Sequence, residues 1–331
     1  MGKISWFFRA VAYRFSALVQ KRKIYKKIFI NTDKNRYFVF SHGIGDVVWT
    51  CCFFKSFLSK QTDYRTPCIV CTKRDIPLIK CFNIDIKVIG LSKNDLIQIG
   101  KYCSKKRFSK DVFVCVYPKL KSRRIMLREL YECSRLGLEM DVIYKYGCFN
   151  LVLNDRFVKP DLRAYKEQAI KTEQKKKLQK GKTVVLIPYA NSRLSPKEDF
   201  WEMISETLIK NGYDVYTNVS GENEKPIGKT KELFLPLEEL PIVIKEIGCV
   251  ISCRCGLYDW LFINECNGIL VHSYDSNNEL SYNFAQKESF ESMRYRCGLN
   301  SRVFELRIDR NDFSKSVADE VLTKVNILMK S

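Results

Sequence analysis

The sequence predicts an α/β protein of two domains, each a mainly parallel sheet with helices on both faces. Three observations support this fold class: apolar runs of strand length alternate with amphipathic runs of helix length, the connections between them are short, and the pattern occurs twice. The chain of 331 residues is long enough for two cores. Its 46% hydrophobic and 13% aromatic content is typical of a globular protein.

The first domain is predicted over residues 29–165, after a basic arm at residues 1–28. It begins with a short buried strand, Tyr37–Phe40, followed by a glycine turn and a helix that opens at Asp46. Further strands are predicted at Cys68–Cys71, Ile84–Ile89 and Val112–Val116. A loop at Lys119–Arg124 and a helix at Met126–Leu136 are predicted to follow.

The second domain is predicted over residues 183–310, after a charged linker or exposed helix at residues 166–182. Its predicted strands are Thr183–Pro188, Tyr213–Val219, Cys249–Ser252 and Gly268–His272. Its predicted helices are Asp199–Gly212, Leu240–Ile247 and a helix that follows a turn at Arg254. A last helix at residues 311–331 has Val317, Val321, Val325 and Leu328 at helical spacing.

The turn after the first strand, from Ser41 to Asp46, is the most informative segment. Gly43 and Gly45 allow the backbone to turn sharply and to approach a bound group closely. The free N–H groups of the next helix point into the same space, and open α/β sheets hold ligands at this end of their strands. Asp46 is therefore either a functional carboxylate or the N-cap of the helix, since Asp is a favoured N-cap residue.

The two halves together resemble the GT-B glycosyltransferases, specifically the ADP-heptose:lipopolysaccharide heptosyltransferase family (glycosyltransferase family 9) and related bacterial surface-polysaccharide transferases. Four segments between about residues 36 and 275 carry the resemblance: Gly43–Thr50, Asn191–Lys197 with the helix after it, Ser220–Glu224 and Arg254–Asp259. The resemblance implies two Rossmann-like domains with a cleft between them. It also implies a nucleotide-sugar donor bound to the second domain, and a last helix that crosses back to the first.

The resemblance assigns roles to individual residues. It makes Asp46 the catalytic base, within an acceptor-side loop that contains His42, Gly43 and Gly45. The implied donor-binding residues are Asn191, Ser192, Arg193 and Lys197 for the phosphates, Glu222 or Glu224 for the ribose, and Arg254, Cys255, Gly256, Leu257 and Asp259 for the pyrophosphate loop.

The last of these loops departs from the family pattern. The family has Asp and His where this chain has Arg254 and Asp259, so the signs of the two charges are exchanged and the identity of the donor stays open. Plainer interpretations remain. Lys197 can be a solvated residue at a helix start, Glu222 and Glu224 can belong to a turn, and Asp259 can be the partner that Arg254 needs beside a buried strand end.

Glycosyl transfer suits these residue types. A carboxylate can deprotonate the acceptor hydroxyl as it attacks the anomeric carbon, and preorganised N–H groups and cations can stabilise the departing diphosphate. No Asp-x-Asp sequence lies in an obvious loop after a strand, and the chain has only two His residues, so we expect no metal and no cofactor.

The charge balance predicts a polyanionic partner. The chain has 57 basic and 37 acidic residues, and no zinc-finger, RNP or helix-turn-helix pattern that would indicate nucleic acid. Residues 3–27 combine large apolar and aromatic residues with a basic cluster, while Arg9 and Arg14 interrupt any membrane span. We expect this arm to lie on the anionic inner face of a cytoplasmic membrane. Packing on its own domain or on a partner subunit is the alternative.

The 14 cysteines are predicted to be reduced, because several lie in apolar runs where a thiol behaves as a small hydrophobe. Cys68 and Cys71 have Cys-x-x-Cys spacing, but no second pair stands at zinc spacing.

The sequence therefore predicts a metal-independent glycosyltransferase that uses a nucleotide sugar and a lipid-linked or surface-glycan acceptor, of lipopolysaccharide, capsule or O-antigen type. The resemblance alone implies that the reaction inverts the anomeric configuration. One alternative is a related transferase of another activated group, such as a fucosyl unit. The other is a non-catalytic nucleotide- or glycan-binding protein with the same fold, which a structure with Asp46 buried away from the cleft would favour.

Overall fold

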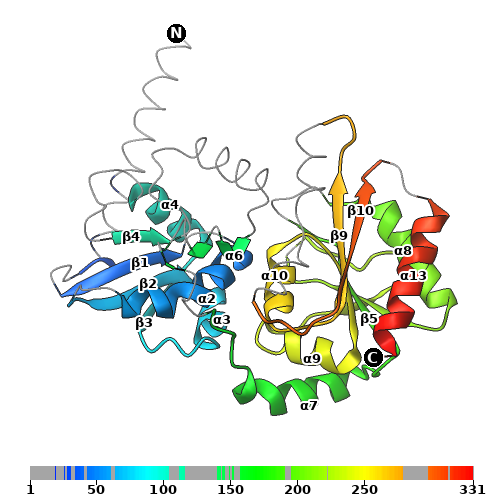
Figure 1. Ribbon diagram of the computed structural model, residues 1–331, viewed down its shortest axis with the longest axis horizontal. Coiled ribbons are helices and arrows are strands. Elements are labelled where there is room, and N and C mark those ends of the chain that lie inside the picture. Colours follow the sequence, from blue (N-terminus) through cyan, green and yellow to red (C-terminus); the bar gives the residue numbers. More distant parts are fainter. Residues whose placement is uncertain are drawn as a thin grey trace, which may run out of the picture.

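The computed structural model of the chain describes residues 19, 26, 28–30, 34–40, 43–60, 64–103, 112–115, 140–142, 144, 145, 149, 151, 152, 157–190, 195–221, 223–278, 297–311 and 314–330. Figure 1 shows two α/β bodies side by side, joined along one edge by a helix of the connecting segment. The predicted basic arm, of which only scattered residues are described, and the predicted loop and helix at 119–136 lie outside the described residues.

The first domain has a four-stranded parallel sheet in the order β3-β2-β1-β4. Its elements are β1 (Asn35–Phe40), α2 (Ile44–Ser59), β2 (Thr66–Thr72), the 3-10 turn η1 (Lys73–Asp75), α3 (Ile76–Lys80), β3 (Lys87–Leu91), α4 (Lys93–Cys103), β4 (Val112–Cys115) and α6 (Met140–Val142). Because side chains alternate along β1, Phe38 and Phe40 pack with α2, while Tyr37 and Val39 pack with α4 on the other face.

The second domain has a six-stranded parallel sheet in the order β10-β9-β8-β5-β6-β7. Its elements are β5 (Thr183–Ile187), α8 (Glu198–Lys210), β6 (Asp214–Asn218), β7 (Lys231–Leu233), α9 (Leu240–Ile247), β8 (Cys249–Cys253), α10 (Gly256–Ile263), β9 (Gly268–Tyr274), β10 (Val303–Asp309) and α13 (Lys315–Met329). Helices α8 and α13 cover one face of the sheet and α9 covers the other.

The predicted α/β fold class and most of the predicted elements are confirmed, while the short helices α3 and α6 and the helix α4 were not predicted. Strand β3 begins at Lys87 rather than Ile84, because the chain is still turning where the Ile86 N–H donates to the Ile84 carbonyl at 2.9 Å. Strands β7 and β10 were not predicted from the sequence. Both lie at edges of the second sheet, where fewer of their residues are buried and the apolar signal is weaker.

The last helix also differs from its prediction. The apolar face that the sequence predicts is present, since Val321, Val325 and Leu328 of α13 are buried and Val317 packs beside them. This face packs against α8, β8 and β9 of the second domain, so α13 does not cross back to the first domain (Figure 1). The reason is that the second sheet has an apolar face beside α8, and the apolar side chains of α13 are buried against it.

The two domains share an apolar interface. Helix α2 of the first domain packs against α10 of the second, and one continuous cluster of buried side chains includes Phe53 and Phe82 together with Tyr258 and Trp260. The rings of Phe82 and Trp260 lie 6.1 Å apart between centroids. Burial of large aromatic rings is a major source of interface energy, so this contact holds the two sheets in a defined relation.

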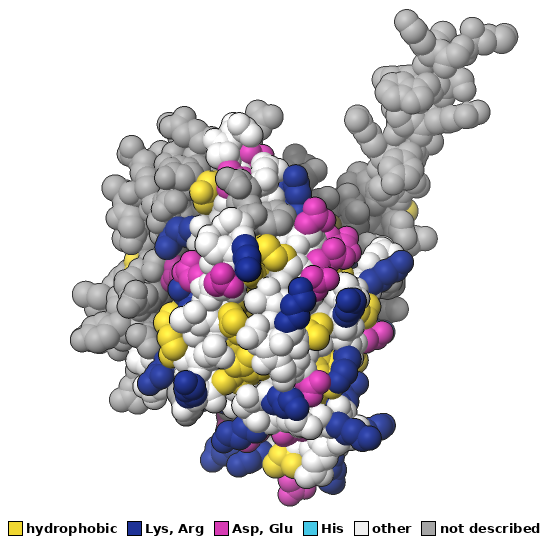
Figure 2. Space-filling model, turned by 90° about the vertical axis from the view of Figure 1, so that its right-hand side faces the viewer, with side chains coloured by type: hydrophobic (Ala, Val, Ile, Leu, Met, Phe, Trp, Pro, Cys, Tyr) yellow, Lys and Arg dark blue, Asp and Glu magenta, His cyan; other side chains and the backbone are white. Residues whose placement is uncertain are grey.

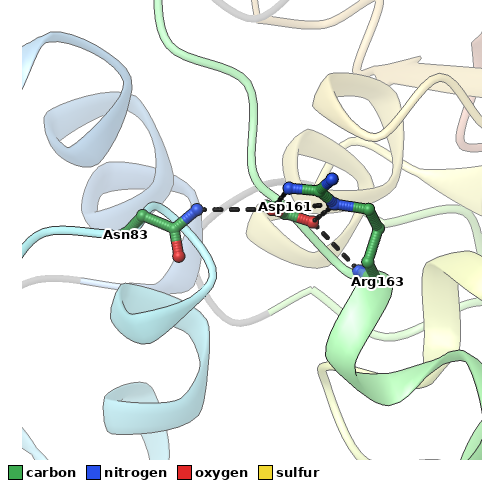
Figure 3. A network of polar contacts seen from close by, with 3 residues as sticks. All are labelled: Asn83, Asp161 and Arg163. Atoms are coloured by element: carbon green, nitrogen blue, oxygen red, sulfur yellow. Dashed lines mark hydrogen bonds and ion pairs between the residues drawn. The ribbon is translucent and has the colours of Figure 1, made fainter.

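A connecting strap, residues 157–165 with the 3-10 turn η3 (Arg163–Tyr165), is attached to both domains. On the first, the Val158 N–H donates to the Cys52 carbonyl at 2.9 Å. Asp161 accepts from Asn83 Nδ2 at 3.4 Å and from Arg163 Nη2 at 2.6 Å, as Figure 3 shows. On the second domain, Lys159 Nζ donates to Glu265 Oε1 at 2.7 Å. The strap is thus bonded to both domains and is not a free linker.

The predicted charged segment forms helix α7 (Lys166–Lys176), which runs along the lower edge of the molecule in Figure 1. Only Ala169 of this helix is buried. The face of the second domain drawn in Figure 2 carries Lys and Arg side chains interspersed with Asp and Glu, with small groups of apolar side chains between them. No helix among the described residues is long and apolar enough to cross a membrane.

Candidate functional site

The strand orders define where each sheet can hold a ligand. In the first sheet the order reverses between β1 and β4, and in the second it reverses between β5 and β8. Ligands of open α/β sheets bind outside the carboxyl ends of the strands at such reversal points. Of the four predicted site segments, three directly follow β1, β5 and β8. The fourth follows β6, the neighbour of β5. The described residues of the segments after β1, β5 and β8 therefore lie at the two places where the topology favours binding, and Glu224 lies beyond the neighbouring strand β6.

Asp46 is not the N-cap of its helix. Gly43 holds that position with extended backbone, its carbonyl accepts from the Val47 N–H at 3.1 Å, and Asp46 is the third residue of α2. The Asp46 carboxylate instead accepts a hydrogen bond from the Tyr144 hydroxyl, with 2.5 Å between Tyr144 Oη and Asp46 Oδ1. Asp46 is partly exposed. A negative charge in the first turn is also stabilised by the helix dipole.

The loop after β8 contains a buried ion pair. Arg254 Nη1 lies 2.9 Å from Asp259 Oδ1 and 3.1 Å from Asp259 Oδ2, and the two residues are 8% and 4% exposed. Burial raises the pKa of the Asp259 carboxyl, and the Arg254 guanidinium opposes that shift. Arg254 therefore has the local partner that the sequence left open as the plainer interpretation.

Two glycines bring the site segments of the two domains into contact. A Cβ atom on Gly256 would lie 2.5 Å from the backbone nitrogen of Gly45, and a Cβ atom on Gly45 would collide with the Asp259 carboxylate. Only residues without a side chain permit this approach. The first turn of α2, with Asp46, thus faces the first turn of α10 across the domain interface.

Cys255 is the N-cap residue of α10 and is partly exposed. Its pKa is lowered to about 7, chiefly by a hydrogen bond with Cys253, while burial opposes the shift. The N–H groups of Tyr258 and Leu257 act in the same direction as Cys253. Groups that stabilise a thiolate at this helix start can also stabilise another anion there.

Lys197 and Glu224 occupy the loops after β5 and β6. Lys197 is the exposed N-cap residue of α8 and makes no ion pair with any described residue. Glu224 Oε2 accepts from the N–H groups of Ser220 and Gly221 at 2.7 and 2.9 Å, so this carboxylate closes its own turn. The hydroxyl of Tyr189, two residues after β5, donates to the Lys225 carbonyl at 2.5 Å and connects the two loops.

Several predicted site residues, namely His42, Asn191, Ser192, Arg193 and Glu222, lie outside the described part of the chain. Tyr144 was not predicted from the sequence, because it stands 98 residues from Asp46 and no local pattern connects the two. The Cys-x-x-Cys pair does not form a site: Cys68 and Cys71 are buried on opposite faces of the first sheet, as expected for residues three apart in a strand. The ten cysteines that can be described are all free.

Comparison with known proteins identifies the fold. No family model matches the chain, and no curated protein sequence is similar to it. A structure of the E. coli ADP-heptose lps heptosyltransferase II matches with a TM-score of 0.57 at 12% identity, covering 89% of this chain and 98% of that one. The glycosyl transferase family 9 from Veillonella parvula DSM 2008 matches with a TM-score of 0.52 at 11% identity, covering 90% and 98%. The chain has the GT-B fold of these structures, as its sequence predicts.

Proposed function

We propose that the protein is a glycosyltransferase that moves a sugar from a nucleotide-sugar donor to a hydroxyl of a glycan or lipid-linked acceptor. One observation carries the proposal. A partly exposed carboxylate at the reversal point of the first sheet faces a helix start at the reversal point of the second, within the GT-B fold. An Asp46 buried away from the cleft would favour the non-catalytic alternative, and Asp46 is instead partly exposed.

In this reaction Asp46 takes the proton of the acceptor hydroxyl while the oxygen attacks the anomeric carbon. The bond from that carbon to the diphosphate breaks, and the diphosphate leaves with the bonding electrons. A single displacement of this kind inverts the anomeric configuration. A positioned base of this type contributes roughly 10²- to 10⁴-fold to the rate.

The second domain supplies the groups that stabilise the leaving diphosphate. These are the N–H groups at the start of α10 and the exposed cation Lys197, at the carboxyl ends of the adjacent strands β8 and β5. Arg254 is engaged with Asp259, so we assign it to shaping the loop rather than to direct binding of phosphate. In this proposal the charge is stabilised by protein groups, without a metal.

Two measurements test the proposal. A thermal-shift screen against ADP-, UDP-, GDP-, CMP- and dTDP-sugars should single out one nucleotide family, since a ligand at 100 times its Kd stabilises the folded state by about 2.7 kcal/mol. With that donor, Asp46→Asn should lower kcat by roughly 10²- to 10⁴-fold without changing the circular dichroism spectrum. Turnover within a few-fold of the wild type would rule out Asp46 as the base. Absence of any shift from a folded sample would argue against the donor class.

A further inference from the structure

We infer that Tyr144 is a positioning residue that orients the Asp46 carboxylate, so that one oxygen is held by the tyrosine and the other faces the acceptor hydroxyl. The inference rests on the proposed function, because it assigns a role to the contact at the proposed base. Its starting point is the 2.5 Å hydrogen bond from Tyr144 Oη to Asp46 Oδ1. No described residue donates a hydrogen bond to Asp46 Oδ2.

The tyrosine ring is held along the same helix that carries the base. Tyr144 is 3% exposed, and its ring stacks on that of Trp49 with 6.3 Å between centroids and 25° between planes. Trp49 follows Asp46 by three residues in α2, so the two side chains lie on one side of the helix. Because the Tyr144 ring stacks on Trp49, its hydroxyl reaches Asp46, which lies about one helical turn before Trp49.

The segment that bears Tyr144 is anchored to α2 at a second point. The Phe149 N–H donates to the Tyr144 carbonyl at 3.2 Å. The Phe149 ring lies 5.0 Å from that of Phe57 and 6.3 Å from that of Phe54. Tyr144 and Phe149 thus follow α2 from its first turn to its last, and the hydroxyl is fixed by packing rather than by the hydrogen bond alone.

This arrangement has a chemical consequence. A carboxylate on a helix surface can rotate about its last side-chain bond, and a short hydrogen bond to one oxygen removes that freedom. Holding the reacting group in one orientation lowers the entropic part of the barrier. Asp46 is in this way held in one orientation, with one carboxylate oxygen available.

The variant Tyr144→Phe tests the inference, because it removes the hydroxyl and keeps the ring. In protein labelled with carbon-13 at the aspartate carboxyls, the signal absent from Asp46→Asn is that of Asp46. We expect the chemical shift of this signal, measured at one pH, to change in Tyr144→Phe, because the hydrogen bond to Asp46 Oδ1 is lost. With the donor identified by the screen, we expect kcat to fall by about tenfold while the KM for the donor stays unchanged.

Tyr37→Phe is the matched control. Tyr37 is 2% exposed in the same domain, and its hydroxyl donates to the Ile30 carbonyl at 2.6 Å, away from Asp46. Loss of the Tyr37 hydroxyl should affect stability without moving the Asp46 signal. The inference is overturned if the Asp46 signal has the same chemical shift in Tyr144→Phe as in the wild type, or if Tyr37→Phe moves it equally. The NMR result does not depend on turnover, so it stands apart from the outcome of Asp46→Asn kinetics.

Discussion

The two sides of the domain interface hold their charged groups in different ways. In the first domain, the Asp46 carboxylate is partly exposed and is held by a tyrosine 98 residues away. In the second, Arg254 and Asp259 are five residues apart, nearly excluded from solvent, and paired with each other. In the proposed reaction, the first arrangement leaves a carboxylate oxygen available for chemistry, whereas the second pairs the two charges within one loop.

The largest effect on stability is expected from Arg254→Met, which leaves Asp259 buried without its partner. Removal of one member of a buried ion pair costs about 3–5 kcal/mol in the free energy of unfolding. Without Arg254, the guanidinium no longer opposes the effect of burial, which raises the folded-state pKa of Asp259 above its unfolded value. The folded variant then binds a proton more readily than the unfolded chain, so its stability falls as pH rises through that window. Urea unfolding at acidic and neutral pH measures both effects.

The matched control for this variant is an exposed pair in the same domain. Lys231 Nζ lies 3.0 Å from Asp214 Oδ1, and the two side chains are 59% and 30% exposed. Lys231→Met should cost less than about 1 kcal/mol, since water already solvates both charges. The double variant Arg254→Met, Asp259→Leu should recover much of the stability lost by Arg254→Met. Equal losses for Arg254→Met and Lys231→Met would remove the distinction between the two kinds of pair.

A smaller effect is expected where the domains touch. In Gly256→Ala the new Cβ meets the backbone of Gly45 in the other domain, and neither backbone can move aside without shifting a helix. Overpacking of this kind costs about 1–3 kcal/mol in the free energy of unfolding. Gly43→Ala is the control, because no atom lies within 4 Å of its Cβ position and its φ of −68° suits any residue. Similar unfolding midpoints for Gly256→Ala and Gly43→Ala would show that Gly256 is not in close contact with Gly45.

The smallest perturbation is a test of the Cys255 thiol at the start of α10, because this experiment substitutes no residue. Cys255 has a pKa of about 7, so its alkylation by iodoacetamide should rise with pH and reach half its maximal rate near pH 7. Burial raises the pKa of Cys249 and Cys266 to about 12, and both should stay unmodified in the folded protein. Peptide mapping by mass spectrometry separates Cys255 from the partly exposed Cys297. A Cys255 rate that stays flat between about pH 6 and 8 would contradict an anion-stabilising helix start here.

Much of the fold follows from local patterns in the sequence. The strand β5 and the helix α9 begin where the apolar periodicity predicts, because each element is specified by residues within a few positions of one another. The Arg254–Asp259 pair was also open to prediction, since a turn into a helix brings residues five apart together. The positions of Asp46 and Lys197 after strands are likewise local features.

Long-range packing decided the rest. The order of the strands, which puts β1 and β5 at the reversal points of their sheets, depends on pairings between segments far apart in the chain. The contact of Gly45 with Gly256 and the hydrogen bond from Tyr144 to Asp46 arise only when α2 packs against α10 and when the segment around Tyr144 packs along α2. The sequence by itself determined which residues can do chemistry. Only the tertiary structure decided which of them face each other, because such contacts depend on packing rather than on local backbone preference.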